Sequence, residues 1–510
     1  MLRFRSSRSL LSSVARPALL ACLLGGALTA CTVGPDYERP DTPQPAAYRE
    51  TVTGDAAKDA ALSPEIAADW WRQFNSPELD SLIARVAANN FDVRAAVARI
   101  RQAEGVVTEQ RSTLFPTVSA DVGRTRSQTG GGTTTVSNGN YITSNNISSN
   151  YSAKLSATYE LDFWGKNRSA LESAKASLDY SRYDKQTVLM TAIADVATDY
   201  FTCLAYKDRL ALARQSLKDA EDMLLGIRAR ARAGTATDVD VANQENVVEA
   251  ERANIPQYEQ SLAQEMDALA ILVGVLPEQL KIDGTTLSGL VEPEVAPNLP
   301  STLLRRRPDV ASAEATLIAG AATLRNVIAQ QYPDISLTGS YGYQNADLGK
   351  LFDPASELWS IGSSLTQTVF DAGNLQAQSD VQRAKVEELT ADYQKAVVTA
   401  FSDVEDALAG VRYTRQIRTA QEKATSAADV ALKGTTGQFQ RGTADMVSVL
   451  TTQRTLFSSQ DTLVQSRLNY LTSIVTLYRV LGGGWSVDQT EAAADPSPAT
   501  KPAPSPVAGG

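Results

Sequence analysis

The sequence predicts a mainly α-helical fold with a β-barrel portion, built from a duplicated unit. Three observations support this prediction: short motifs that recur in order along the chain, long stretches without proline, and segments in which apolar and polar residues alternate. At about 150 residues per domain, a chain of 510 residues would otherwise suggest about three domains.

The recurring motifs indicate an internal repeat. The tripeptide Gly234–Ala236 recurs as Gly442–Ala444, 208 residues later. Near the start of each half the spacing is 217 residues, so the first half carries nine extra residues. The other matched pairs are Leu272–Gly274 with Val480–Gly482, Gly165 with Gly373, Asp92-Val93 with Asp309-Val310, and Phe115-Pro116 with Tyr332-Pro333. The order of these motifs predicts one plan for both halves: helix, strand, strand, long helix, turn, helix.

Residues 1–30 have the features of a secretory signal, with four arginines followed by the short apolar run Pro17–Leu28. That run is too short to span a bilayer as a helix. The segment Leu28–Cys31 resembles a bacterial lipobox, which implies that Cys31 is lipidated and becomes the first residue of the mature chain. The alternative is an ordinary cleavage site with an incidental cysteine. Thr32 takes the place of the Asp that retains such lipoproteins at the inner membrane, and so permits sorting to the outer membrane.

The composition excludes several kinds of chemistry. Histidine is absent from the sequence, which rules out Ser-His-Asp and Cys-His nucleophilic sites and histidine-containing zinc sites. The balance of 48 basic against 58 acidic residues argues against a nucleic-acid partner. Loss of residues 1–30 leaves 44 basic residues and a net charge of −14. Cys203 is expected to be a buried, inert thiol. We therefore expect no enzymatic activity, no metal site and no cofactor apart from a covalent lipid on Cys31.

Four amphipathic strands are predicted, two in each half. Residues 151–162 alternate over six periods, residues 118–122 and 335–343 alternate over fewer, and the segment around Trp359–Val369 alternates less regularly. Gly130–Asn150, rich in Gly, Thr, Ser and Asn, is predicted to be a long polar loop. Such strands fit an outer-membrane barrel or a half-buried soluble sheet. The lipoprotein signal, and the lack of a later apolar run of about 18 residues, favour the membrane.

Two very long helices are predicted, because 166–232 and 374–438 contain no proline and little glycine. Each would be about 100 Å long and would return as a second helix after the Gly-Thr-Ala turn. Apolar residues from Leu389 to Val411 step by threes and fours, as along a coiled-coil seam. Four strands cannot close a barrel, because the smallest single-chain barrels have about eight. The barrel must be shared, either by two chains or by three, and three would leave a lumen.

Several motifs resemble those of the TolC/OprM type of outer-membrane efflux factor, in its lipoprotein (NodT-like) branch. Besides the lipobox, they are Val33–Tyr37, Trp70-Trp71, Ser76–Leu79, Leu161–Gly165, Arg306–Val310 and Phe370–Gly373. The resemblance implies a lipid-anchored homotrimer in the bacterial outer membrane, with a shared twelve-stranded barrel and a periplasmic α-helical barrel. It also implies a passive exit duct of a tripartite pump, working with a periplasmic adaptor and an inner-membrane RND-type transporter to export drugs or other toxic small molecules.

The resemblance also implies a periplasmic gate near the helical turns. The family often has an Asp nine residues after the second turn glycine and a Tyr three residues before that glycine, and these positions are Thr451 and Phe439 here. The candidate gate residues are Asp238, Asp240, Asp445, Arg232, Arg441 and Phe439. Acids repeated around a pore would favour cations, and the two arginines could offset the repulsion among them. Alternatively, the acids cap the returning helices, and both roles can hold together.

The predicted boundaries are 1–30 for the signal peptide, 31–78 for the lipidated N-terminal segment and equatorial packing, 79–274 for the first repeat, 275–302 for an equatorial linker, 303–482 for the second repeat and 483–510 for a disordered tail. The basic cluster Arg305–Arg307 is expected to be solvated or to face the adaptor. Two other functions stay open: a channel for type I protein secretion, and a lipid-anchored periplasmic coiled-coil scaffold without a pore.

Overall fold

The computed structural model describes residues 32–42, 45, 47–50, 52, 67–129, 134–137, 140–143, 146–293, 305–483 and 485. The predictions for the signal peptide, for Cys31 and for the tail after residue 485 lie outside the described residues. The chain forms two compact units, both discontinuous in sequence. The first contains residues 102–178 and 315–391 with the N-terminal segment up to Arg39, and the second contains 40–101, 179–314 and 392–510.

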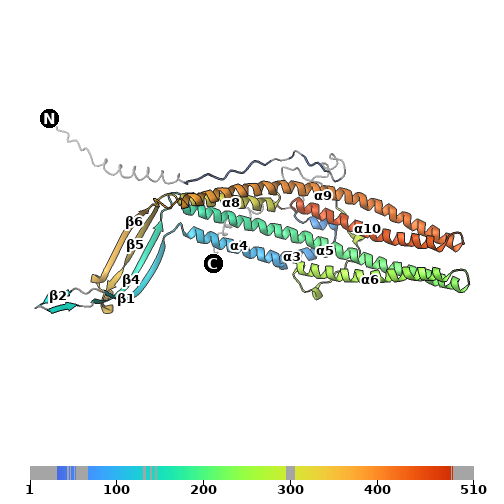
Figure 1. Cartoon of the computed structure of the whole chain (residues 1–510), viewed down its shortest axis with the longest axis horizontal. Coiled ribbons are helices and arrows are strands. Elements are labelled where there is room, and N and C mark those ends of the chain that lie inside the picture. Colours follow the sequence, from blue (N-terminus) through green and yellow to red (C-terminus); the bar gives the residue numbers. More distant parts are fainter. Residues whose placement is uncertain are drawn as a thin grey trace, which may run out of the picture. The chain divides into compact units, whose positions relative to one another are not determined.

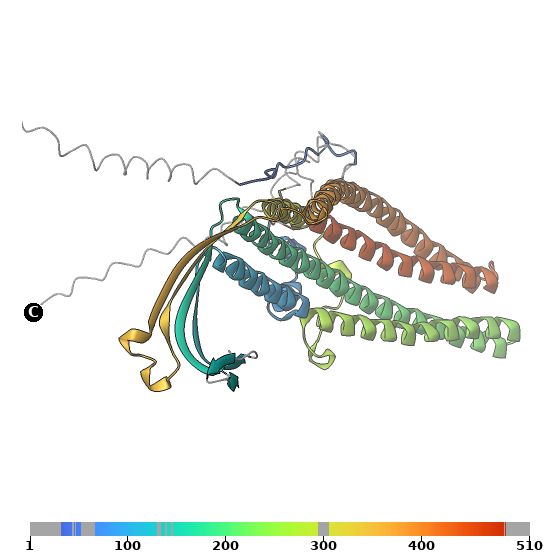
Figure 2. The same ribbon diagram turned by 60° about the vertical axis from the view of Figure 1, so that its left-hand side comes forward.

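The first unit is built on an antiparallel sheet of four curved strands (Figures 1 and 2). The strands are β1 (Thr117–Thr129), β4 (Asn146–Glu160), β5 (Asp334–Asn345) and β6 (Glu357–Thr366). Their order in the sheet is β1-β4-β5-β6, so the two halves of the chain meet at the β4–β5 pair. The pairing runs without interruption along each ladder, so every strand keeps one set of alternate residues on each face.

Two details of the strand prediction were wrong. The segment predicted as one polar loop contains a hairpin of β2 (Thr134–Ser137) and β3 (Asn140–Thr143), and β4 begins inside that segment at Asn146. Polar residues with few branched apolar side chains can pair as strands when the backbone ladder supplies the hydrogen bonds. At the other end, Val369 lies beyond β6, which ends at Thr366.

The helices confirm the duplication. Both long helices, α5 (Lys166–Arg232) and α9 (Asn374–Gln440), have 67 residues. The returning helices α6 (Asp238–Val273) and α10 (Met446–Val480) have 36 and 35. The helices before each strand pair, α4 (Phe91–Ser112) and α8 (Pro308–Ala329), both have 22. Short 3-10 turns lie at Trp70–Phe74 (η1), Pro277–Gln279 (η2), Leu287–Gly289 (η3), Leu348–Lys350 (η4) and Pro354–Ser356 (η5).

The helix predicted from Leu79 to Arg111 is interrupted. It is divided into α3 (Pro77–Asn89) and α4, with Asn90 between them. The Asn90 side-chain oxygen accepts hydrogen bonds from the backbone N–H groups of Asp92 and Val93 at 2.9 and 3.0 Å, and its amide donates to Leu272 O at 2.8 Å. Asparagine is among the best N-cap residues, so Asn90 starts a new helix and ties it to the end of α6.

α5 is the single helix among the described residues that is long and apolar enough to cross a membrane by length and composition. Of its most apolar stretch, 56% is buried within the chain. Burial of this extent is typical of a core helix, and we treat α5 as one.

The second unit has an aromatic core near the chain's N-terminal segments. Trp70 stacks on Tyr478 with ring centroids 4.8 Å apart, and Phe74 lies 5.0 Å from Phe201. Cys203, two residues after Phe201 on α5, is fully buried, and burial raises the pKa of its thiol to about 12. The prediction that this thiol is buried is confirmed, and the raised pKa disfavours the thiolate, which is the reactive form.

Candidate functional site: an apolar sheet face and two helical turns

One face of the sheet is apolar and exposed. Residues that pair across strands share a face, so Val122 lies with Leu155, and Tyr341 lies between Leu155 and Trp359. These side chains are 85, 53, 48 and 71% exposed in the single chain. An apolar face of this size on water would be unfavourable, and lipid is the environment that it fits.

Aromatic side chains lie at both ends of this face. At the end next to the helices, Trp164 stacks on Tyr332 with centroids 4.9 Å apart and donates a hydrogen bond to Pro333 O at 2.8 Å. At the far end, the Tyr341 and Tyr343 rings are 6.1 Å apart, and Tyr343 lies 5.5 Å from Phe352. Transmembrane strands carry such aromatic belts on both sides of an apolar band about 25 Å tall.

The opposite face of the sheet is polar. Hydroxyl ladders run across it, with Ser336 and Ser364 2.8 Å apart, and Ser340 and Ser360 2.8 Å apart. Asp121 and Lys154 are opposite each other on β1 and β4. At the base of the sheet Lys166 pairs with Glu160 at 2.8 Å. The sheet therefore separates an apolar surface from a surface that water can wet.

The first helical turn is held by a capping box. Gly234 adopts a positive φ of 75° at the end of α5, which a residue with a Cβ takes up only with strain. Thr237 then caps α6: its hydroxyl accepts from the Asp240 N–H, and the Asp240 carboxylate accepts from the Thr237 N–H at 2.9 Å and from its hydroxyl at 2.8 Å. Asp240 is thus a capping residue, whereas Asp238 and Arg232 are exposed.

The second turn has a simpler cap. Asp445 precedes α10 and accepts a hydrogen bond from the Ser448 N–H at 2.8 Å, and hydrogen bonds from Ser448 hold the pKa of Asp445 below its usual value. Thr451 is exposed, and its hydroxyl donates to Val447 O at 2.8 Å, so it is satisfied within its own helix. Arg441 is exposed at the end of α9. The capping interpretation of Asp240 and Asp445 is therefore supported by direct contacts.

Phe439 contacts an arginine that the sequence did not single out. The Arg230 guanidinium lies 4.4 Å from the centroid of the Phe439 ring and donates to the Phe439 carbonyl at 3.4 Å. This cation–π contact joins the first hairpin to the second. In the described part of the chain, the six candidate gate residues form no hydrogen bond or ion pair with one another.

Below the turns, the two helical hairpins pack on a common apolar cluster. It contains residues of α5, α6 and α10, with Phe439 and Leu432 of α9 packed against it. The buried members are Ala220, Leu224, Ile227, Val247, Val248, Met446, Val449 and Leu450. Figures 1 and 2 show α5 beside α6 and α9 beside α10 over this length. The turns therefore end a packed four-helix region, as the predicted hairpins require.

A polar network ties the hairpins further along. Arg209 on α5 binds both carboxylate oxygens of Asp461 on α10, at 2.6 and 2.8 Å, and the Tyr258 hydroxyl on α6 donates to Asp461 at 3.1 Å. The Arg209 guanidinium also lies 4.7 Å from the Tyr258 ring centroid. Three helices thus share one bidentate ion pair, the strong form of such a contact.

The prediction that the basic cluster Arg305–Arg307 is solvated or faces the adaptor was wrong for Arg307. Its side chain is 9% exposed and binds Asp309 at 2.5 Å, Asp403 on α9 at 2.9 Å, and Ala400 O at 3.2 Å. Burial alone would lower the pKa of Arg307, but the hydrogen bonds and charges of the two carboxylates outweigh it and raise the pKa. The proline after Arg307 starts α8, and the arginine joins that start to α9 rather than facing solvent or an adaptor.

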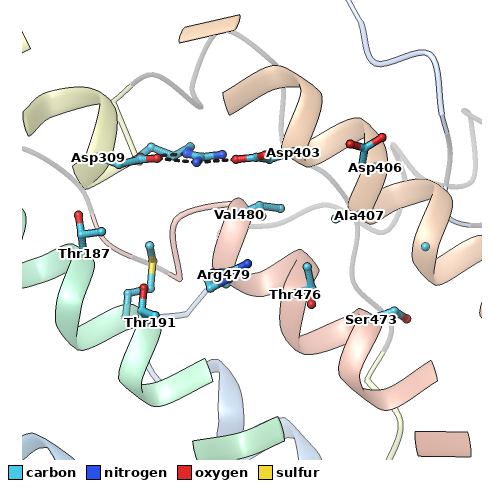
Figure 3. A pocket seen from close by; sticks show the side chains of 13 residues that line it. Thr187, Thr191, Asp309, Asp403, Asp406, Ala407, Ser473, Thr476, Arg479 and Val480 are labelled. Atoms are coloured by element: carbon cyan, nitrogen blue, oxygen red, sulfur yellow. Dashed lines mark hydrogen bonds and ion pairs between the residues drawn. The ribbon is translucent and has the colours of Figure 1, made fainter. Parts of the chain in front are cut away.

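The Arg307 ion pairs border a cavity of about 370 Å³ in the second unit (Figure 3). Hydroxyl and charged side chains line it, and Asp406 and Arg479 add one charge of each sign. Within the described residues, no group of three or more Cys, Asp or Glu side chains could hold a metal ion.

A carboxylate pair on α5 and α6 was not predicted. Burial, followed by the charge of Glu265, raises the pKa of Asp199 to about 7. Asp199 lies on α5 and Glu265 on α6, 66 positions apart in sequence. No local sequence motif therefore indicates this pair.

An exposed apolar sheet face with aromatic ends, a polar opposite face and paired helical hairpins define the subunit of a membrane channel. Comparison with known families identifies it further. The chain belongs to the outer membrane efflux protein family, which matches residues 82–275 and 299–483, one segment in each half. It is therefore an outer-membrane exit duct of an efflux pump.

Similar proteins agree with this assignment. The chain is 36% identical over 426 residues to the pyoverdine export outer membrane protein OpmQ of Pseudomonas aeruginosa, covering 82% of this chain and 88% of that protein. It is 32% identical over 481 residues to the toluene efflux pump outer membrane protein TtgC of Pseudomonas putida, covering 92 and 95%. The open state of the MtrE outer membrane channel of Neisseria gonorrhoeae superposes with a TM-score of 0.78 at 27% identity, covering 89 and 98%.

Proposed function

We propose that three copies of this chain form a passive exit duct, lipid-anchored through Cys31 in the outer membrane and extending into the periplasm. The observation that carries the trimer is the unfinished sheet: β1 and β6 are its two edges among the described residues, and both present long unpaired ladders. Four strands per chain need partners to close. Three chains supply twelve strands, enough to leave a lumen.

The cargo is a small toxic molecule or drug, and the energy comes from a partner. The relatives are named for pyoverdine export and for toluene efflux, which supports small molecules over secreted proteins as cargo. The duct has no catalytic activity and no cofactor of its own. A periplasmic adaptor and an inner-membrane RND-type transporter supply substrate selection and energy. A pore-free scaffold is disfavoured, because it would have no use for the exposed apolar sheet face.

The test is planar-bilayer conductance of the purified protein together with its native mass. We expect discrete channels and a mass of three chains. A monomeric native mass together with an absence of conductance would contradict the proposed duct.

The capping residue Asp240 also serves the gate in this proposal. Three copies of the turn would surround the periplasmic opening. The capping box would keep each turn in the conformation that closes this opening. We expect Asp240→Ala to raise single-channel conductance and sensitivity to vancomycin, because the Thr237 N–H and hydroxyl lose the carboxylate that accepts from them and the turn is held less firmly. Asp240→Asn keeps an acceptor oxygen for the Thr237 N–H and removes the charge.

The two variants separate the roles. If conductance rises with Asp240→Ala but not with Asp240→Asn, the hydrogen bonds of the capping box hold the gate. If conductance rises with both variants, the charge of Asp240 holds it. Unchanged conductance in both variants would contradict a role for Asp240 in the gate.

A further inference from the structure

Two arginines lie on the apolar face of the sheet. The β1–β4 register places Arg124 opposite Tyr151 and Arg126 opposite Ser149. Arg124 and Arg126 have the same parity as Val118 and Val122, and the ladder is uninterrupted, so all four side chains lie on one face. Both arginines are exposed.

The part of the chain that the structure describes leaves both of these charges without an ion pair. Among the described residues, neither guanidinium has an ion pair, and the segment 130–145 that follows β1 contains no Asp or Glu at all. The Arg124 guanidinium lies 5.4 Å from the centroid of the Tyr151 ring, which orients it without neutralising it. Two arginines without an ion pair therefore lie on the face that carries Val122, Leu155 and Tyr341.

Their position along the strand is informative. β1 starts at Thr117, directly after α4, so the arginines lie toward the end of the strand away from the helices. Arg124 is level with Tyr151, and Tyr341, Tyr343 and Trp359 lie on the same face within a few residues of that level. These aromatic side chains mark the boundary of the apolar band. The guanidinium groups therefore lie where the apolar band meets the headgroups.

We propose that Arg124 and Arg126 bind the phosphate groups of lipid A, the phosphorylated glycolipid of the outer leaflet, while the apolar residues below them contact its acyl chains. The proposal rests on the proposed function, because it requires the sheet to span the outer membrane. Guanidinium groups match phosphate in geometry as well as in charge. The Tyr151 ring holds one of them in place.

The test measures retention of lipid A by the purified full-length trimer in detergent, by native mass spectrometry. The variant is Arg124→Gln with Arg126→Gln. The matched control is Lys154→Gln, which removes one positive charge from the opposite face of the same sheet. Each basic residue near an anionic surface contributes about fivefold to binding. We expect the affinity for lipid A to fall by about tenfold or more in the double variant and to stay within twofold in the control.

Two further measurements make the outcome specific. Lipid A stripped of its phosphates should bind the wild type and the double variant equally. The fall in affinity between wild type and double variant should be less than half as large for phosphatidylglycerol as for lipid A, because phosphatidylglycerol offers a single phosphate. Equal affinities of wild type and double variant for lipid A would overturn the proposal, as would an equal loss in the control.

A contact between chains is the competing explanation. Glu357 is opposite Tyr343 on the same face and belongs to the other edge strand. If the arginines paired with this residue of a neighbouring copy, Glu357→Gln and the double variant would both lower the thermal stability of the trimer, with lipid A affinity unchanged. That result would also overturn the proposal. If the protein forms a trimer with channel conductance but the double variant keeps its affinity for lipid A, the lipid proposal is wrong and the proposed duct still holds.

Discussion

Replacing Gly342 with alanine should prevent assembly of the duct. A Cβ at this position would lie 2.3 Å from Ala153 O and 2.5 Å from Lys154 Cα, both backbone atoms of β4. Backbone atoms in the middle of a ladder cannot move aside without breaking pairs on both sides. Overpacking of this kind costs about 3 kcal/mol, and the cost recurs in every copy. We expect the yield of heat-stable trimer to fall at least tenfold, measured by gel mobility before and after heating.

Gly339→Ala is the matched control for that variant. Gly339 lies on the same strand, three residues earlier, and a Cβ added there would meet nothing within 4 Å. Its trimer yield should equal that of the wild type. A normal yield of the Gly342→Ala trimer would show that the β4–β5 pair is looser than the structure indicates.

Removing the buried arginine that precedes α8, Arg307, should have the second large effect. Arg307→Met leaves Asp309 and Asp403 without their cation and removes the hydrogen bond from the guanidinium to Ala400 O. Removing one partner of a buried ion pair costs about 3 kcal/mol or more. Because the two carboxylates are 40 and 37% exposed, water offsets part of this cost, and we expect about 2 kcal/mol. The measurement is the midpoint of urea unfolding of the purified protein, followed by circular dichroism.

Arg214→Met provides the comparison. Arg214 pairs with Glu259 at 2.8 Å, but the two side chains are 59 and 50% exposed, and such surface pairs contribute at most about 1 kcal/mol. The unfolding midpoint of this variant should shift little. Equal shifts for the two variants would show that Arg307 acts as an ordinary surface charge.

The regular parts of the fold could be predicted because their signals repeat. The absence of proline over both long helices and the recurrence of Gly234 as Gly442 predicted paired hairpins of matched length, and the structure has them. The break at Asn90 was missed because a single capping asparagine interrupts an otherwise helical pattern. The β2–β3 hairpin was missed because its residues alternate too weakly to be distinguished from a polar loop.

The site was predictable in outline and less so in its contacts. Asp240 and Asp445 could be singled out because acids at the start of a helix have a local role. Arg230 on Phe439, Arg307 on Asp403 and Arg209 on Asp461 join residues about a hundred or more positions apart. Contacts of this kind depend on the packing of one helix against another, and a one-dimensional pattern carries no information about them.

The open edges of the sheet have a consequence for the life of the chain before assembly. A folded single copy exposes the ladders of β1 and β6 together with an apolar face, and such edges recruit any strand that they meet. The edge strands of other copies and the strands of unrelated chains compete for the same backbone hydrogen bonds of β1 and β6. A single copy is therefore prone to aggregate until its two edge strands pair with those of other copies.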